Sequence, residues 1–185
     1  ISALVGNLWA VINPWKAIFE RAEGFYERLN QNRKLSLNRR YPGYLGVWPG
    51  VLFFMAFAWV ELVYSQSATP IRIAQMAIIY SLITWGGMFY YGKDVWLRCG
   101  ESFSLVFGLL AKFSATEIRV KSSYAICREC ATCSINKSMN CIGCEHCFER
   151  APRTLRELNI RPYATGLLNN ESVSPSMLVL VLLLL

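Results

Sequence analysis

The sequence predicts an all-α membrane protein with at least two transmembrane helices, interfacial helices and a small Cys-rich cytoplasmic lobe. Three observations lead to this fold class. The chain of 185 residues has 54% hydrophobic residues and a mean hydropathy of +0.30, a composition that indicates a membrane protein. Two apolar stretches are long enough to cross a bilayer. Six of the seven cysteines lie together in one polar segment.

Residues 1–40 are expected to form an N-terminal segment with one amphipathic helix at about 14–30. Asn13 and Pro14 predict where this helix begins, because Asn is a good helix cap and Pro is favoured at the first helical position. Apolar side chains recur on one face, and charged side chains occupy the others. With Lys and Arg close to a span, the helix is expected to lie along the cytoplasmic membrane surface. Packing against a partner protein is the open alternative.

Residues 41–113 are expected to form the membrane region, with transmembrane helices at about 44–64 and 71–91. At about 1.5 Å per residue, each helix can cross a hydrocarbon core about 30 Å thick. Tyr and Trp cluster toward the ends of both stretches, as in interfacial aromatic belts. The alternative is a pair of buried helices in a soluble protein. Glu61 is the one carboxylate within a span and so a proton-path candidate, although near the outer end it is expected to reach the interface.

A further helix is expected at about 96–113. Gly100, Ser104 and Gly108 recur at four-residue spacing, which allows another helix to approach closely. The uninterrupted apolar part is too short to span a bilayer, and charged residues bound it. An interfacial or re-entrant helix is therefore predicted.

The distribution of Lys and Arg predicts the orientation. Both flanks of the two spans are rich in Lys and Arg, whereas the connecting turn at 65–70 has none and only Arg72 breaks the bias. The positive-inside rule places both flanks and the cysteines in the cytoplasm. The formal net charge of +7 is then explained by topology, and no nucleic acid partner is expected. The expected partners are the lipid bilayer and other membrane-protein subunits.

Residues 114–176 are expected to form the cytoplasmic lobe and to bind a metal. Its six cysteines have the spacing of ligands, with two residues between members of each triplet: Cys127, Cys130, Cys133, Cys141, Cys144 and Cys147. Cytosolic thiols are kept reduced, which disfavours disulfides. Thiolates in such pairs prefer zinc or iron-sulfur centres. Because the lobe has few large apolar side chains, a bound centre is expected to stabilise its fold.

The spacing favours a [4Fe-4S] cluster over zinc. The second triplet follows the bacterial ferredoxin run and ends in Pro152, except that Ala151 stands where the fourth cysteine would be. A cluster would use Cys141, Cys144 and Cys147 with a fourth thiolate from the first triplet. Zinc, the alternative, would use four of the six thiolates, and His146 is a poor ligand candidate because it adjoins Cys147. Cys99 lies outside the pattern and is expected to be a packing residue.

Two further segments complete the expected organisation. Residues 154–159 predict a short helix that ends before Arg161 and Pro162. Residues 177–185 are wholly apolar and span about half a membrane crossing. They are expected to begin another transmembrane helix, cut off in a fragment of a larger polytopic protein.

Several motifs resemble those of one family. They are YPGYLGVWP and FAWVELVY in residues 41–64, WLRCGESF at 96–103, FGLLAKFS at 107–114 and RPYATGLL at 161–168. Together with the cysteine lobe they are similar to a family of polytopic bacterial and archaeal membrane proteins labelled fenitrothion hydrolase. The resemblance implies a multi-pass protein of a prokaryotic plasma membrane.

The residues carry no catalytic constellation for hydrolysis. The chain has one His, and it has no G-x-S-x-G elbow and no H-E-x-x-H pair. The leading hypothesis is an electron-transfer subunit of a larger membrane complex. The alternatives are a structural or assembly subunit with a fold-stabilising zinc site, and a fragment of a membrane enzyme or transporter whose active site lies outside this chain.

Overall fold

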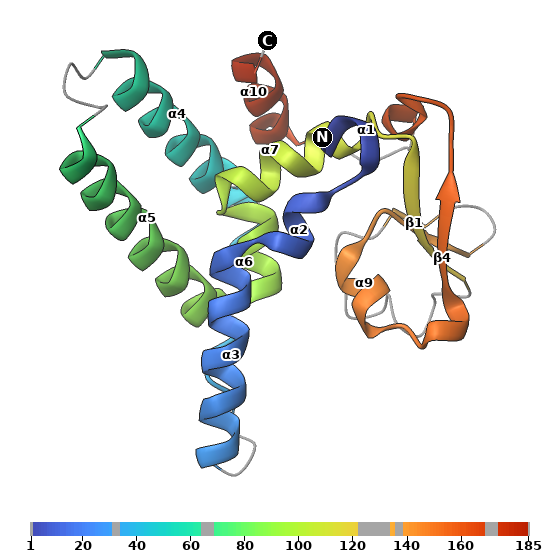
Figure 1. Ribbon diagram of the computed structural model, residues 1–185, viewed down its shortest axis with the longest axis horizontal. Helices are drawn as coiled ribbons and strands as arrows, with labels where there is room; N and C mark the ends of the chain where they lie inside the picture. Colours follow the sequence, from blue (N-terminus) through green and yellow to red (C-terminus); the bar gives the residue numbers. More distant parts are fainter. Residues whose placement is uncertain are drawn as a thin grey trace. The chain divides into compact units, whose positions relative to one another are not determined.

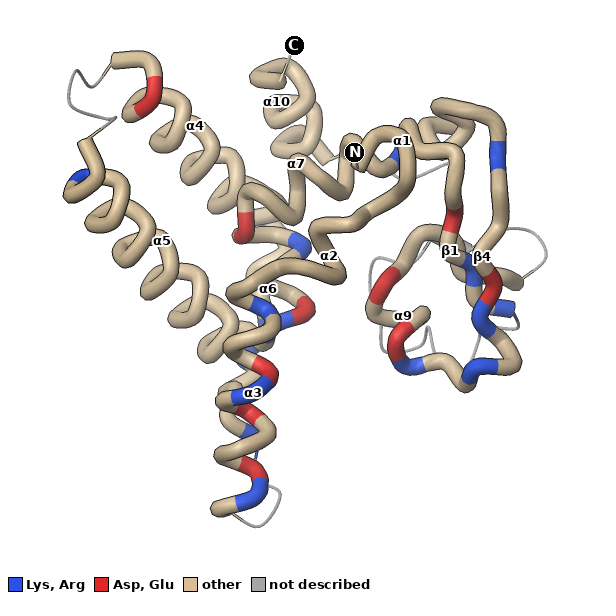
Figure 2. Tube along the Cα trace, in the orientation of Figure 1, with Lys and Arg blue, Asp and Glu red and all other residues tan. Residues whose placement is uncertain are grey.

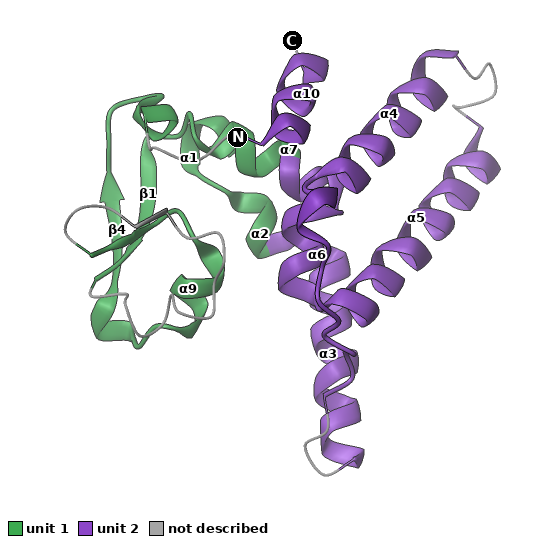
Figure 3. Cartoon of the chain, turned by 180° about the vertical axis from the view of Figure 1, so that it is seen from behind, with its two compact units in different colours: residues 1–11, 106–172 green, residues 12–105, 173–185 purple. Residues whose placement is uncertain are grey.

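The computed structural model describes residues 2–30, 34–63, 69–121, 134–135, 139–168 and 174–184. The chain divides into two compact units, coloured separately in Figure 3. The first unit consists of Ile1–Val11 and Val106–Ser172, and the second of Ile12–Leu105 and Val173–Leu185. The unit that contains the cysteines therefore differs from the expected lobe at 114–176, because it also takes in the first residues of the chain.

The second unit is helical (Figure 1). Its elements are α3 (Pro14–Leu29), the 3-10 turn η1 (Gly43–Leu45), α4 (Trp48–Val63), α5 (Pro70–Tyr91), α6 (Lys93–Cys99), the start of α7 (Ser102–Ala111) and α10 (Pro175–Leu184). Helix α3 begins as its sequence predicts: the Asn13 side chain accepts a hydrogen bond of 3.1 Å from the Lys16 N–H, and Pro14 occupies the first turn.

Two stretches in this unit are long and apolar enough to span a membrane: Gly43–Val63 and Pro70–Tyr91. Only 11% and 17% of their most apolar windows are buried within the chain, whereas a core helix of a soluble protein is mostly buried. Figure 2 shows α4 and α5 almost free of charge, while α3 carries both signs. Large apolar side chains that are more than half exposed include Leu52, Phe57 and Leu62 of α4, and Ile71, Ile79 and Leu82 of α5.

Small buried clusters join the helices of this unit. Phe19 of α3, Met88 of α5 and Trp96 of α6 form one cluster, and Val51 of α4, Leu105 of α7 and Leu180 of α10 form another. Gly87 makes room for Trp96, because a Cβ atom at Gly87 would lie 2.1 Å from the indole. This close approach explains one of the glycines in the apolar stretch.

The prediction of one continuous helix at about 96–113 is wrong, because two helices cover this stretch. The chain leaves α6 at Cys99 and enters α7 at Ser102. Gly100 caps the end of α6 through its N–H, which donates 2.7 Å to the Trp96 carbonyl. The Glu101 carboxylate then accepts from the N–H groups of Phe103 and Ser104 at the start of α7. Each helix end therefore has its own partners, and this ends one helix and begins the next.

The first unit contains a small antiparallel sheet, so the prediction of an all-α chain holds only in the coarser sense that the chain is mostly helical. The strands are β1 (Thr116–Val120), β2 (Ser134–Ile135), β3 (Cys141–Ile142) and β4 (Arg156–Ile160), in the order β2-β3-β1-β4. The remaining elements are α1 (Ser2–Val5), α2 (Leu8–Ile12), α9 (Glu145–Arg150), η2 (Arg153–Leu155) and η3 (Thr165–Leu168).

The prediction of a short helix at 154–159 is also wrong. Residues 153–155 form the 3-10 turn η2, and the next five residues form β4. Strand β4 pairs with the whole of β1, from Thr116 opposite Ile160 to Val120 opposite Arg156. Pairing with a distant strand overrides the weak local helix signal. In β1 the apolar and charged side chains alternate, as expected of a half-buried strand.

Candidate metal centre

Three of the predicted ligands lie together in the first unit. The sulfur atoms of Cys141, Cys144 and Cys147 are all within 4.8 Å of one another. Cys141 lies in β3, Cys144 at the N-cap of α9, and Cys147 in the first turn of that helix. Residues three apart at a helix start lie on one side of the helix, so the Cys-x2-Cys spacing directs both thiols of α9 toward the strand.

The turn that joins β3 to α9 positions these thiols. Gly143 has a φ of +68°, a left-handed conformation that favours glycine. Its N–H donates 2.9 Å to the Ile118 carbonyl of β1, and Cys141 pairs with Val120 of the same strand. The sheet thereby holds one ligand in place and fixes the start of the helix that carries the other two.

The surroundings of the thiols are apolar. Cys141 and Cys147 are fully buried in a cluster with Val120 and Ala151, while Cys144, Phe148 and Leu155 pack against it. Ala151, where the ferredoxin run has a cysteine, is itself 1% exposed and so serves as a packing residue beside the thiols. An apolar shell excludes water from thiolate ligands, as in many metal centres.

The donor set fits a soft metal but is incomplete within the described residues. Reduced thiolates are typical ligands of zinc and of iron-sulfur centres, and closed sites use four ligands. The predicted ligands Cys127, Cys130 and Cys133 lie outside the residues that the structure describes. In the described part of the chain, His146 is half-buried but does not belong to the group of close ligand atoms.

A cavity of about 250 Å³ lies beside the centre, within the same unit. Ile142 and Gly143, the two residues between Cys141 and Cys144, form part of its wall, and Glu145 and Phe148 of α9 form another part. The Asn7 amide, from the start of the chain, donates a short hydrogen bond to the Glu145 carboxylate. Sequence reasoning missed this contact because the two residues are 138 positions apart.

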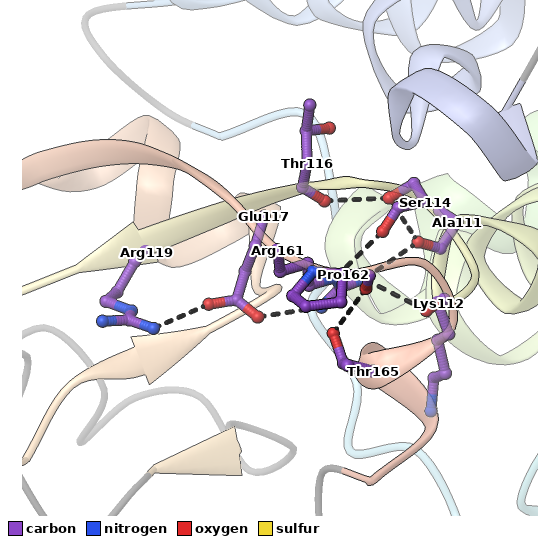
Figure 4. Close-up of polar contacts among 9 residues, drawn as sticks. All are labelled: Ala111, Lys112, Ser114, Thr116, Glu117, Arg119, Arg161, Pro162 and Thr165. Carbon is purple, nitrogen blue, oxygen red and sulfur yellow. Dashed lines mark hydrogen bonds and ion pairs between the residues drawn. The ribbon is translucent and has the colours of Figure 1, made fainter.

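Arg161 forms hydrogen bonds both to strand β1 and to the end of α7 (Figure 4). Its guanidinium donates 2.8 Å to the Glu117 carboxylate of β1 and 3.0 Å to the Ser114 carbonyl, and it also reaches the carbonyls of Ala111 and Lys112. Carbonyls at the end of a helix lack N–H partners within it; the Ala111 carbonyl accepts from the Ser114 hydroxyl as well as from Arg161. The sequence marked Arg161 as the end of a predicted helix and as part of a family motif, and the structure shows its bonds to β1 and to the end of α7.

Two other residues that the sequence singled out belong to the second unit. Cys99, at the end of α6, is half-buried, and burial raises the pKa of its thiol. This agrees with the expected packing role. Glu61 is exposed near the end of α4. The fully buried carboxylate of this unit is instead Glu101, which sequence reasoning did not single out.

Comparison of the chain with protein-family models, with curated proteins and with solved structures finds no match.

Proposed function

We propose that the chain is a membrane-embedded protein whose lobe folds around a metal centre bound by cysteine thiolates. The observation that carries this proposal is the convergence of the Cys141, Cys144 and Cys147 sulfurs within 4.8 Å in an apolar shell. The fourth ligand would come from Cys127, Cys130 or Cys133. Cys133 is bonded to Ser134, which pairs with Ile142 next to Cys141, so a short chain path links the two triplets.

The spacing of the sulfurs favours a single ion. Around one tetrahedral ion with metal–sulfur bonds of about 2.3 Å, ligand sulfurs lie roughly 3.8 Å apart. In a four-iron cluster each thiolate binds a different iron, and the sulfurs are further apart. The geometry therefore supports the zinc alternative, with the centre as a fold-stabilising element of a structural or assembly subunit.

Electron transfer through an iron-sulfur centre is the second candidate. The ferredoxin-like run from Cys141 to Pro152 favours it. In this case the lobe would pass electrons to or from another subunit of a membrane complex.

The membrane location is supported by the exposed apolar surfaces of α4 and α5. In water such surfaces would be unfavourable, whereas in lipid they are solvated. The one-sided distribution of Lys and Arg further supports a cytoplasmic lobe. The resemblance of the motifs implies a prokaryotic plasma membrane, and the apolar spans imply the lipid bilayer and other membrane-protein subunits as partners.

Metal analysis tests the proposal. Protein purified without oxygen is expected to contain one metal centre per chain, as zinc without acid-labile sulfide for a single structural ion, or as iron with matching sulfide for a cluster. The variant C144S removes one ligand and is expected to lose the metal, whereas the matched variant C99S should retain it. A wild-type protein without zinc or iron, or a C144S variant that keeps its full metal content, would refute the proposal.

A further inference from the structure

The break between α6 and α7 holds a buried carboxylate in the second unit. Glu101 is 0% exposed, although it lies between two helices of a highly apolar chain. Irregular backbone among membrane helices occurs where it is buried in protein or lines a polar site. Acidic groups in such positions are usually functional, because charge is strongly disfavoured in hydrocarbon.

Four donors from three parts of the unit surround this carboxylate. The N–H groups of Phe103 and Ser104 donate at 3.0 and 2.7 Å, and the Asn13 amide donates at 3.3 Å. The Tyr80 hydroxyl of α5 donates a short hydrogen bond to Oε1. Asn13 also donates 3.2 Å to the Ser104 hydroxyl, which extends the polar network by one residue.

The network lies halfway along a candidate span. Tyr80 is the eleventh of the 22 residues of α5. Helix α6 packs along α5, with Trp96 against Gly87, and thereby carries Glu101 back to the level of Tyr80. If α5 crosses the bilayer, the Glu101 carboxylate lies near its middle, which is where ion-coupled membrane proteins place sites at broken helices.

A cap alone does not explain a glutamate at this position. Ser, Thr or Asn at the start of α7 would bind the same N–H groups without placing a charge inside the unit. The Tyr80 hydroxyl can form a hydrogen bond with either protonation state of the Glu101 carboxyl group. Its hydroxyl donates to the ionised carboxylate, and after rotation of the O–H it accepts from the protonated acid, since a phenol is both donor and acceptor.

We propose that Glu101, with Tyr80 as its hydrogen-bonding partner, is a proton-binding site at the middle of the membrane. This inference rests on the proposed membrane location, and it is independent of the metal. Helix α7, which follows Glu101, has no titratable side chain. Helix α4 contacts this region at Gly50, whose carbonyl accepts from the Ser102 hydroxyl, and its carboxylate Glu61 lies about three turns further along the helix. The other titratable groups near the network in the sequence are Tyr80 of α5, Arg98 and Cys99 of α6, and Lys16 of α3.

Infrared spectroscopy of the full chain in lipid nanodiscs tests the proposal. Because the chain has 12 Asp and Glu residues, the band of Glu101 is isolated by subtraction. The spectrum of acidified wild-type protein minus that of acidified E101Q is expected to leave one carboxylic-acid C=O band that shifts in deuterium oxide. E61Q, a matched change of the exposed carboxylate of α4, should retain this band. In Y80F the band should move in frequency, because the protonated acid loses its hydrogen bond to the Tyr80 hydroxyl.

The Y80F variant keeps the test decisive if E101Q fails to fold, because it retains Glu101. A difference spectrum without the band, or a Y80F variant whose band keeps the wild-type frequency, would overturn the proton site and leave Glu101 as a cap. Membrane integration is measured separately, as resistance of the wild-type chain to alkaline extraction. An extracted chain would refute the membrane location and this inference with it, whereas a retained chain that lacks the band refutes the inference alone.

Discussion

Gly166 shows at the residue scale how closely the first unit is packed around Arg161. A Cβ atom at this glycine would lie 2.3 Å from the Arg161 guanidinium and 2.4 Å from the Lys112 carbonyl. The variant G166A is therefore expected to destabilise the unit by about 1–3 kcal/mol, as overpacking does. The control G24A, on α3, has no neighbour within 4 Å. It should be neutral or stabilising by up to about 1 kcal/mol.

Thermal unfolding of both variants measures the difference. Equal melting temperatures for G166A and the wild type would show that the Arg161 network does not constrain this turn.

The thiol of Cys99 is expected to react slowly. Burial raises its pKa, and only the thiolate is a good nucleophile. At neutral pH its alkylation rate should therefore fall below that of a free cysteine and rise as the pH increases toward the raised value. The rate can be followed by mass spectrometry on the metal-loaded protein, with C99S to assign the signal. Alkylation as fast as that of free cysteine would contradict the buried placement.

At the scale of elements, the α5–α6 contact offers a matched pair of glycines. A Cβ atom at Gly87 would lie 2.1 Å from the Trp96 indole, whereas Gly86, its neighbour on the same helix, has no atom within 4 Å. We expect G87A to displace α6 and destabilise the second unit by about 1–3 kcal/mol, and G86A to be tolerated. Quenching of Trp fluorescence during denaturation compares the two, and equal stability would argue against the close contact.

The elements differ in how far the sequence predicts them. The long apolar helices and the start of α3 at Asn13 follow from composition and local capping, so they are visible in the sequence. The sheet is not, because β2 and β3 have two residues each and exist only through pairing, β3 with β1 and β2 with β3. The break before Ser102 is not predicted either, although Gly100 and Glu101 cap the two helix ends, and the contact of Glu101 with Tyr80 of α5 is a tertiary one that periodicity does not reveal.

The same contrast applies to the candidate site. The ligand spacing identifies Cys141, Cys144 and Cys147, because vicinal Cys-x2-Cys pairs carry their chemistry locally. Their surroundings are assembled by distant residues: Val120 pairs with Cys141, and Asn7 binds Glu145. Ala151 is likewise buried beside the thiols by the fold, so its packing role is not visible in the sequence.

At the scale of the whole molecule, the chain combines a helical unit with exposed apolar surfaces and a small sheet unit built around thiols. Among the described residues of the sheet unit, four form the buried cluster, and two of them are Cys141 and Cys147. A core of this size provides little hydrophobic stabilisation, so a bound metal is expected to supply much of the folding free energy of this unit. Chelation of the metal should therefore increase proteolysis within residues 106–172 before the helical unit is cleaved.

X-ray absorption spectroscopy at the edge of the metal in the purified protein tests most directly whether the cysteines hold a metal. We expect about four sulfur ligands at about 2.3 Å. A single ion would show no short metal–metal distance, and an iron-sulfur cluster would show one. A metal coordinated mainly by nitrogen and oxygen would contradict thiolate binding, because the cysteines would then not hold it.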